Sequence, residues 1–199
     1  MIGVIDYGMG NIFSVMNALK KIAANAEVIK KPADLAKADA IIVPGVGSFD
    51  KTMENLRPYQ ETLTTALDSG TPFLGICMGL QALFERSEEG KRKGLGIIEG
   101  DVIRLPETVL VPQMGWNDLR IEKETCLLEG IESGDFFYFV HSYYGEPKDK
   151  TVTAATTEHG VRVTAAIVKD NIAAVQFHPE KSGKKGLLIL ENFIRETKC

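Results

Sequence analysis

Thr71-Pro72-Phe73-Leu74-Gly75-Ile76-Cys77-Met78-Gly79 is the stretch that decides the fold, because an apolar run ends at a cysteine held between two glycines. The apolar run predicts a buried strand, and the residues from Leu80 to Glu85 predict a helix. A sharp turn from strand to helix needs small residues beside its centre, where larger side chains would collide with the backbone. The helix start favours the thiolate form of Cys77. The stretch therefore predicts a nucleophile elbow with sulfur in place of oxygen.

A second motif, Gln176-Phe177-His178-Pro179-Glu180, follows about a hundred residues later. The proline pushes the residue before it into an extended conformation. Residues two apart in an extended segment face the same way, so His178 and Glu180 can meet. The alternative is a buried cysteine that packs as a small hydrophobe, with a merely structural histidine. We favour a hydrolytic centre with Cys77 as nucleophile, His178 as acid and base, and Glu180 orienting the imidazole.

The first half of the chain alternates between strand and helix patterns. We expect strands at 2–6, 40–43 and 73–76, with helices at 11–23 and 49–68. Short apolar strands separated by helices predict a parallel sheet covered on both faces, with a ligand site beyond the carboxyl ends of its strands. The second half is richer in β patterns and closes with a helix: 97–105, 136–141, 152–157, 163–168, 173–177 and 185–195.

Glycine-bearing turns follow the first three predicted strands, and we expect them to converge at the site. The turn after the second strand reads Pro44-Gly45-Val46-Gly47. Its glycines leave the peptide around Val46 and Gly47 free to rotate, so an N–H can point into the oxyanion site or away from it. The N–H of Met78, at the helix start, supplies the other donor of this oxyanion hole.

Composition limits the other possibilities. The chain has 199 residues, 44% of them hydrophobic and 25% charged, so we expect one domain over 1–199. The net charge of -4 argues against a nucleic-acid partner. The three cysteines, Cys77, Cys126 and Cys199, form no Cys-x-x-Cys pair, which favours a reducing compartment and no metal site. With neither a leader pattern nor a membrane-length apolar run, we expect a cytoplasmic protein that does not contact a membrane.

No cofactor is expected either. Gly8-Met9-Gly10 follows the first strand, as in dinucleotide-binding proteins, but Phe13 stands where the third glycine would be needed. No phosphate-binding loop of the Gly-x-x-x-x-Gly-Lys-Ser/Thr type occurs in the sequence. Nothing in the sequence therefore supports the use of a dinucleotide or of ATP.

Three motifs together resemble the signature of the class I (triad) glutamine amidotransferases: Pro44 to Gly47, Gly75 to Gln81 and Gln176 to Glu180. This resemblance implies a flavodoxin-like fold, with a central, mostly parallel sheet flanked by helices and an added antiparallel β portion. Within that family, Pro-Gly-Val-Gly, Gln113-Met114-Gly115-Trp116-Asn117 and Phe139-Val140-His141-Ser142-Tyr143 resemble the glutaminase subunits of imidazole glycerol phosphate synthases.

The resemblance implies a reaction and a partner. Glutamine is hydrolysed to glutamate and ammonia, and the ammonia is passed through a channel to a (β/α)8-barrel cyclase subunit in a heterodimer. The cyclase makes imidazole glycerol phosphate and an aminoimidazole carboxamide ribotide in histidine biosynthesis. The chain has no barrel of its own and would be only the source of ammonia.

The same matching implies roles for further residues. Those expected to hold the glutamine are Gly47, Gln81, Glu89, Ser142 and Tyr143. Those expected at the partner interface are Asn11, Met114, Trp116, Asn117 and Lys181, with Trp116 in a glycine-containing turn. Gln81 lies four residues after Cys77 and so on the same helix face. One departure from the subfamily is Gln113, which replaces a common histidine at a position expected to face the partner.

Other functions stay open at this point. The chain could supply ammonia to a different synthase, such as a sugar amidotransferase. It could be a cysteine peptidase or small-molecule hydrolase of the same architecture, although such proteins usually place a histidine directly after the nucleophile, where this chain has Met78. It could also be a catalytically silent subunit, against which the intact triad argues.

Overall fold

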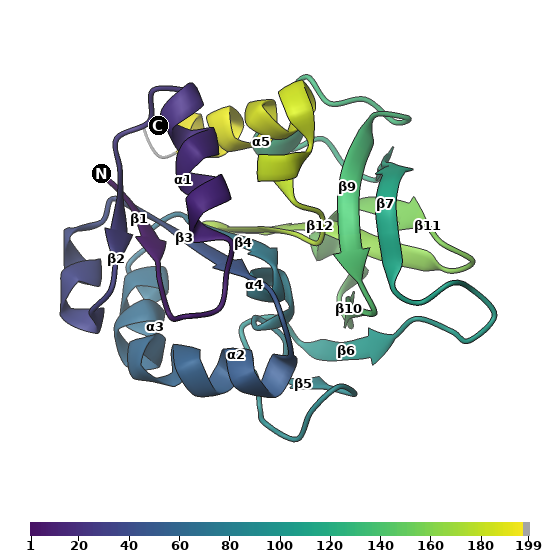
Figure 1. Ribbon diagram of the computed structural model, residues 1–199, viewed down its shortest axis with the longest axis horizontal. Helices are drawn as coiled ribbons and strands as arrows, with labels where there is room; N and C mark the ends of the chain where they lie inside the picture. The colour runs from purple at the N-terminus through teal and green to yellow at the C-terminus, as the bar shows by residue number, and fades with distance from the viewer. Residues whose placement is uncertain (197–199) are drawn as a thin grey trace.

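A sheet of eight strands forms the centre of the computed structural model, which describes residues 1–196 and so leaves Cys199 outside the described residues (Figure 1). In spatial order the strands are β2 (Ala26–Ile29), β1 (Ile2–Ile5), β3 (Ala40–Gly45), β4 (Phe73–Cys77), β13 (Ile172–Val175), β12 (Arg162–Lys169), β11 (Thr153–Glu158) and β8 (Arg120–Ile121). The first five run parallel, and the last three join them antiparallel. The expected mostly parallel sheet with an antiparallel addition is confirmed.

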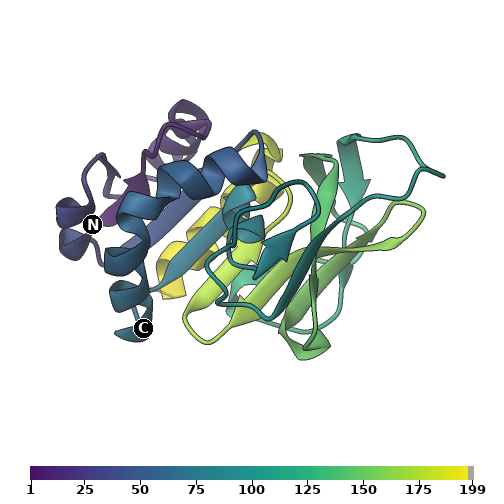
Figure 2. The ribbon, with the colours of Figure 1, turned by 90° about the horizontal axis from the view of Figure 1, so that it is seen from below.

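Helices cover both faces of the sheet (Figures 1 and 2). One face carries α1 (Ile12–Lys21) and α5 (Gly183–Glu196), and the other carries α2 (Phe49–Leu56), the 3-10 turn η2 (Arg57–Tyr59) and α3 (Gln60–Asp68). Because side chains alternate along a strand, each strand fills both layers. In β3, Ile42 packs in the core cluster of α1 and α5, while Ile41 packs in that of α2 and α3.

Two smaller sheets lie against the antiparallel part of the central sheet (Figure 1). One contains β10 (Tyr143–Pro147), β6 (Gly100–Arg104) and β5 (Arg86–Ser87), and the other pairs β7 (Gln113–Asp118) with β9 (Phe136–His141). The prediction of a turn around Trp116 is therefore wrong, since this residue lies in β7. Gly115, at a φ of +131°, suggests a turn in the sequence, but the segment pairs with β9 as a strand. The remaining 3-10 turns are η1 (Pro32–Lys37), η3 (Cys126–Leu128), η4 (Lys150–Val152) and η5 (Pro179–Lys181).

The helix after the elbow is shorter than its sequence predicts. Helix α4 spans only Met78–Gln81, whereas the pattern predicts a helix from Leu80 to Glu85. The N–H of Glu85, which would bond the carbonyl of Gln81 in a helix, donates to the carbonyl of Gly100 instead. The backbone N–H groups of residues 95–97 donate to the carbonyls of residues 82–84. The backbone groups at the end of the expected helix are thus bonded to other segments, and the chain turns away into β5.

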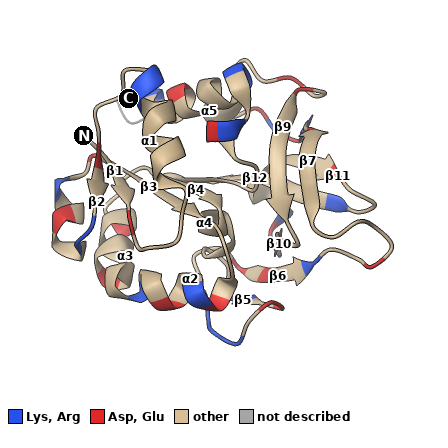
Figure 3. Cartoon of the chain, viewed as in Figure 1, with Lys and Arg blue, Asp and Glu red and all other residues tan. Residues whose placement is uncertain are grey.

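Charged side chains are interspersed over the helices and loops, whereas β9 carries none (Figure 3). Within residues 1–196, no helix has both the length and the apolar character needed to cross a membrane. The same described part of the chain holds no cluster of three or more histidine, cysteine, aspartate or glutamate side chains arranged to bind a metal ion.

Candidate active site

The elbow between β4 and α4 holds Cys77 in a strained conformation, with φ 54° and ψ -104°. A residue with a Cβ rarely adopts a positive φ, and such strain is typical of functional sites. The flanking glycines are required by contact: a Cβ on Gly75 would lie 2.6 Å from the carbonyl oxygen of Gly79, and one on Gly79 would overlap the carbonyl oxygen of Val43. The predicted elbow is therefore present, with the thiol at the carboxyl end of the sheet.

His178 and Glu180 meet as predicted, although not within an extended segment: His178 is extended, whereas Glu180 lies in the 3-10 turn η5. Nδ1 of His178 lies 2.8 Å from Oε1 of Glu180, and the two side chains are 2% and 1% exposed. Burial lowers the pKa of His178, but the interactions with Cys77 and Glu180 outweigh it and raise this pKa to about 9. The imidazole is therefore protonated at neutral pH and is held by a carboxylate on one side, with the sulfur on the other.

The segment that carries His178 is tied to β9. The backbone N–H of His178 donates to the carbonyl of Tyr138 at 2.9 Å. The Ser182 hydroxyl donates to the carbonyl of His178 at 2.7 Å and accepts from the N–H of Tyr138 at 3.0 Å. These bonds fix the ring's backbone against the strand that also lines the pocket.

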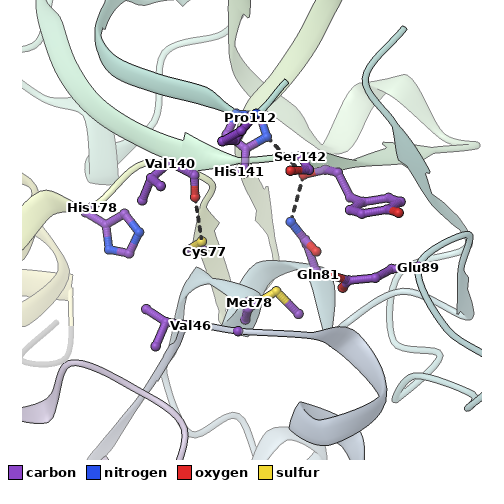
Figure 4. Close-up of a pocket in the computed structure, with 12 residues that line it drawn as sticks. Val46, Cys77, Met78, Gln81, Glu89, Pro112, Val140, His141, Ser142 and His178 are labelled. Carbon is purple, nitrogen blue, oxygen red and sulfur yellow. Dashed lines mark hydrogen bonds between the residues drawn. The ribbon is translucent and has the colours of Figure 1, made fainter. Parts of the chain in front are cut away.

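A cavity of about 390 Å³ opens beside the sulfur (Figure 4). Cys77 and His178 lie toward one end of it in this view, and Gln81 and Glu89 lie toward the other. The cavity is lined by every residue that the sequence assigns to the oxyanion hole or to glutamine: Val46, Gly47, Met78, Gln81, Glu89, Ser142 and Tyr143. The structure thus gathers residues from four distant segments around one thiol.

Two of the pocket side chains have an oxygen left for a ligand. Oε2 of Glu89 accepts from the N–H of Phe49 at 2.7 Å, at the start of α2, and the bond occupies only this oxygen of the carboxylate. Gln81 is 1% exposed, and its Nε2 donates to the Tyr143 carbonyl at 2.8 Å. Oε1 of Gln81 is buried without a hydrogen-bond partner. A buried acceptor without a donor is costly, so it suits the N–H of a bound substrate.

Gln113 does not face outward as the sequence suggests. It is 4% exposed, and its side-chain amide contacts Nε2 of His141 at 3.0 Å. Burial lowers the pKa of His141 to about 4, so this ring is neutral. Its Nδ1 donates to the carbonyl of Tyr143 at 2.9 Å, because a carbonyl can only accept. The departure at Gln113 therefore concerns the wall of the pocket rather than a partner-facing surface.

The residues expected at the partner interface lie outside the pocket. Met114 and Trp116 project from β7 and are 67% and 55% exposed. Lys181 lies over the ring of Tyr138, 5.6 Å from its centroid. Asn11 caps α1 by accepting from the N–H of Ser14, and Asn117 donates to the carbonyl of Glu158 at 2.8 Å. These last two side chains thus have internal partners, which the sequence did not indicate.

The comparison with known proteins agrees with this geometry. The family model of the class-I glutamine amidotransferases matches residues 3–197. The imidazole glycerol phosphate synthase subunit HisH of Methanothermobacter thermautotrophicus is 52% identical over 98% of each chain, and that of Caldanaerobacter subterraneus is 46% identical over 100% of each. The chain belongs to the HisH family of class-I glutamine amidotransferases. The peptidase of similar architecture, one of the alternatives raised by the sequence, is not the family it matches.

More distant solved structures share the fold of this amidotransferase. The structure of PurLQS from Thermotoga maritima aligns with a TM-score of 0.80 at 18% identity, over 98% of this chain and 97% of that one. At such low identity the likeness concerns the arrangement of strands and helices alone. The central sheet and its flanking helices are therefore the shared framework.

Proposed function

We propose that this chain is the glutaminase subunit of an imidazole glycerol phosphate synthase. It hydrolyses glutamine through a thioester on Cys77 and passes the ammonia to a cyclase subunit in a heterodimer. The observation that carries the proposal is the strained elbow thiol beside the His178 and Glu180 pair, at one end of a pocket with polar side chains at its far end. The names of the relatives support the choice of synthase.

The chemistry follows from the geometry. The Cys77 thiolate attacks the carboxamide carbon of glutamine, and the new oxyanion is held by the N–H of Met78 and one from the Val46 and Gly47 turn. His178 gives its proton to the departing nitrogen, which leaves as ammonia. Water then attacks the thioester carbon, His178 takes the proton of the water, and the carbon–sulfur bond breaks to give glutamate. Glu180 keeps the imidazole oriented in both steps.

The second oxyanion donor offers a point of control. Gly47 has a φ of +102°, and Val46 is 37% exposed in a turn that ends β3. A peptide flanked by glycines rotates at little steric cost. We infer that partner binding favours the orientation in which an N–H faces the oxyanion, so that little ammonia is released without an acceptor. Free ammonia in neutral water is mostly protonated, which makes a channel to the cyclase necessary.

The partner surface is proposed to include the exposed side of β7. Trp116 packs edge-on against Tyr138, with ring centroids 6.2 Å apart, and Lys181 lies over the same ring. The carbonyl of Tyr138 accepts from the N–H of His178. Trp116 is thus two contacts away from the proposed catalytic base, and the backbone N–H of Lys181 donates directly to the carbonyl of His178. Exposed aromatic side chains are common anchors of protein interfaces.

The extent of the domain and the cellular compartment are also proposals. We assign residues 1–199 to one glutamine amidotransferase domain, supported by the family match over 3–197. We also assign the protein to the cytoplasm, because a thiolate nucleophile and an exposed free thiol at Cys126 suit a reducing compartment.

Replacement of the thiol tests the glutaminase. Cys77→Ala is expected to abolish glutamine hydrolysis while the purified complex still makes imidazole glycerol phosphate from ammonium salts at high pH, since only the ammonia source is lost. Cys126→Ala, which removes an exposed thiol, is the matched control and is expected to keep full activity. Wild-type glutamine turnover in Cys77→Ala would contradict the assignment.

The partner assignment has its own test. The isolated chain is expected to hydrolyse glutamine slowly and to accelerate when the cyclase and its nucleotide ligand are added. Each tenfold activation corresponds to about 1.4 kcal/mol in favour of the active state. Full activity of the lone chain, unchanged by the cyclase, would leave a free-standing glutaminase or one that serves another synthase.

A further inference from the structure

A buried carboxamide contacts the sulfur of Cys77, which also lies near the Val140 carbonyl of β9. Gln176 directly follows β13 and is fully buried, with 0% exposure. Its Nε2 lies 3.5 Å from Sγ of Cys77. Gln176 has no assigned role in the proposed hydrolysis of glutamine, although it stands two positions before His178, in the bend that follows β13. A fully buried amide beside the nucleophile therefore needs an explanation.

The direction of this amide is fixed by its neighbours. The Tyr143 carbonyl can only accept, so the side-chain atom of Gln81 that faces it at 2.8 Å must be the nitrogen. The second N–H of this Gln81 nitrogen reaches Gln176 at 3.1 Å, where it requires the oxygen Oε1. The NH2 group of Gln176 is then left to face the sulfur.

The chain of hydrogen bonds is anchored at its far end as well. Tyr143 O accepts a second hydrogen bond, from Nδ1 of the neutral His141. Both lone pairs of this carbonyl are therefore used, and the amides of Gln81 and Gln176 cannot flip without breaking at least one buried hydrogen bond. Hydrogen bonds in such a buried chain strengthen one another.

We propose that Gln176 is a further catalytic residue, which donates an N–H to the Cys77 thiolate in an orientation fixed through Gln81 by the Tyr143 carbonyl. The inference rests on the proposed glutaminase function, because it concerns the same nucleophile. An N–H donor stabilises an ionised acceptor more than a neutral one, so Gln176 favours the thiolate over the thiol. When water attacks the thioester and the carbon–sulfur bond breaks, the electron pair returns to sulfur. The same N–H then donates a hydrogen bond to the thiolate that forms.

Other groups around the sulfur also influence its charge, and they set the design of the test. His178, with Glu180 behind it, faces the sulfur from the segment after β13, and the phenol of Tyr7 interacts with it from the segment after β1. His141 on β9 is neutral. All four residues are unchanged in variants of Gln176. A difference in alkylation between such variants and the wild type therefore reports the loss of the N–H donor.

The test measures the rate at which iodoacetamide alkylates Cys77 in the full chain as a function of pH. Gln176→Leu removes the donor, and Gln176→Glu keeps the shape and the bond from Gln81 but turns an acceptor toward the sulfur. We expect the midpoint of the alkylation profile to rise by about one pH unit in Gln176→Leu, a tenfold loss of thiolate at neutral pH, and by more in Gln176→Glu. Glutamine turnover should fall by about tenfold in the leucine variant.

A matched control separates this role from simple destabilisation. Asn192→Leu removes another buried carboxamide, which in α5 donates to the carbonyls of Leu127 and Glu129. It is expected to lower the melting temperature and to leave the alkylation midpoint unchanged. Midpoints within about 0.3 units of wild type in whichever Gln176 variant folds would overturn the inference. Since alkylation needs no glutamine, a wild-type chain that labels at Cys77 but does not hydrolyse glutamine would refute only the proposed function.

Discussion

Gly75→Ala isolates the steric requirement of the elbow. The backbone of Gly75 needs no positive φ, so only space opposes a methyl group there. The new Cβ would lie 2.6 Å from the carbonyl oxygen and 2.7 Å from the carbonyl carbon of Gly79, against the 3.4 Å of ordinary contact. Helix α4 would have to move by about 0.8 Å, since these are backbone atoms that no side-chain rotation can relieve.

The expected cost is at the upper end of the range for overpacking, about 3 kcal/mol in the free energy of unfolding. For a chain of this length that corresponds to a fall of about 6–12 °C in melting temperature. The displaced helix carries the N–H of Met78, and a misplacement of this size is expected to lower kcat for glutamine about 100-fold.

Thermal unfolding and glutaminase assays of the complex measure both effects. The control is Gly70→Ala, at a φ of +84° with no atom within 4 Å, where strain alone acts and costs about 1 kcal/mol. If Gly75→Ala proves as stable and as active as Gly70→Ala, the close packing of α4 on β4 is not what keeps the elbow in its conformation.

The remaining predictions concern charge and contact. Burial lowers the pKa of His178, but the interactions with Cys77 and Glu180 outweigh it and raise this pKa from 6.5 to about 9. Protonation of the ring therefore contributes about 3 kcal/mol of stability, which is complete below about pH 6.5 and is lost as the pH rises through 9. Urea unfolding should show this pH dependence in the wild type and not in His178→Asn. Glu89→Gln keeps the cap on α2 but removes the negative charge that is proposed to bind the ammonium group of glutamine. KM for glutamine should therefore rise about tenfold with kcat unchanged. An equal effect of Glu88→Gln would contradict a specific role of Glu89. Trp116→Ala should raise the Kd for the cyclase by about 30-fold in titration calorimetry, and a Kd within about twofold of wild type would remove this side chain from the interface.

Patterns within a few residues predict most of the framework. The apolar runs of β3 and β4, which are buried along their whole length, and the glycines around Cys77 are local features, so the parallel sheet and the elbow follow from the sequence. His178 and Glu180 also meet, but through a turn that the sequence did not predict: after the extended His178, residues 179–181 form the 3-10 turn η5, with the carboxylate beside the ring. The one local error at the elbow, the length of α4, arises because the N–H of Glu85 donates to the carbonyl of Gly100 rather than to that of Gln81.

The sequence by itself predicted the proposed nucleophile, its proposed base and the sheet that carries them, because each depends on neighbours along the chain. Only the tertiary structure decided what surrounds the sulfur. Gln176 meets Cys77 across 99 residues, and Gln81 meets Tyr143 across 62. The same holds for Gln113, whose burial against His141 depends on the register of β7 with β9. Hydrogen bonds between such distant side chains are set by how the sheets pack, and no spacing in the sequence encodes which way a buried amide points.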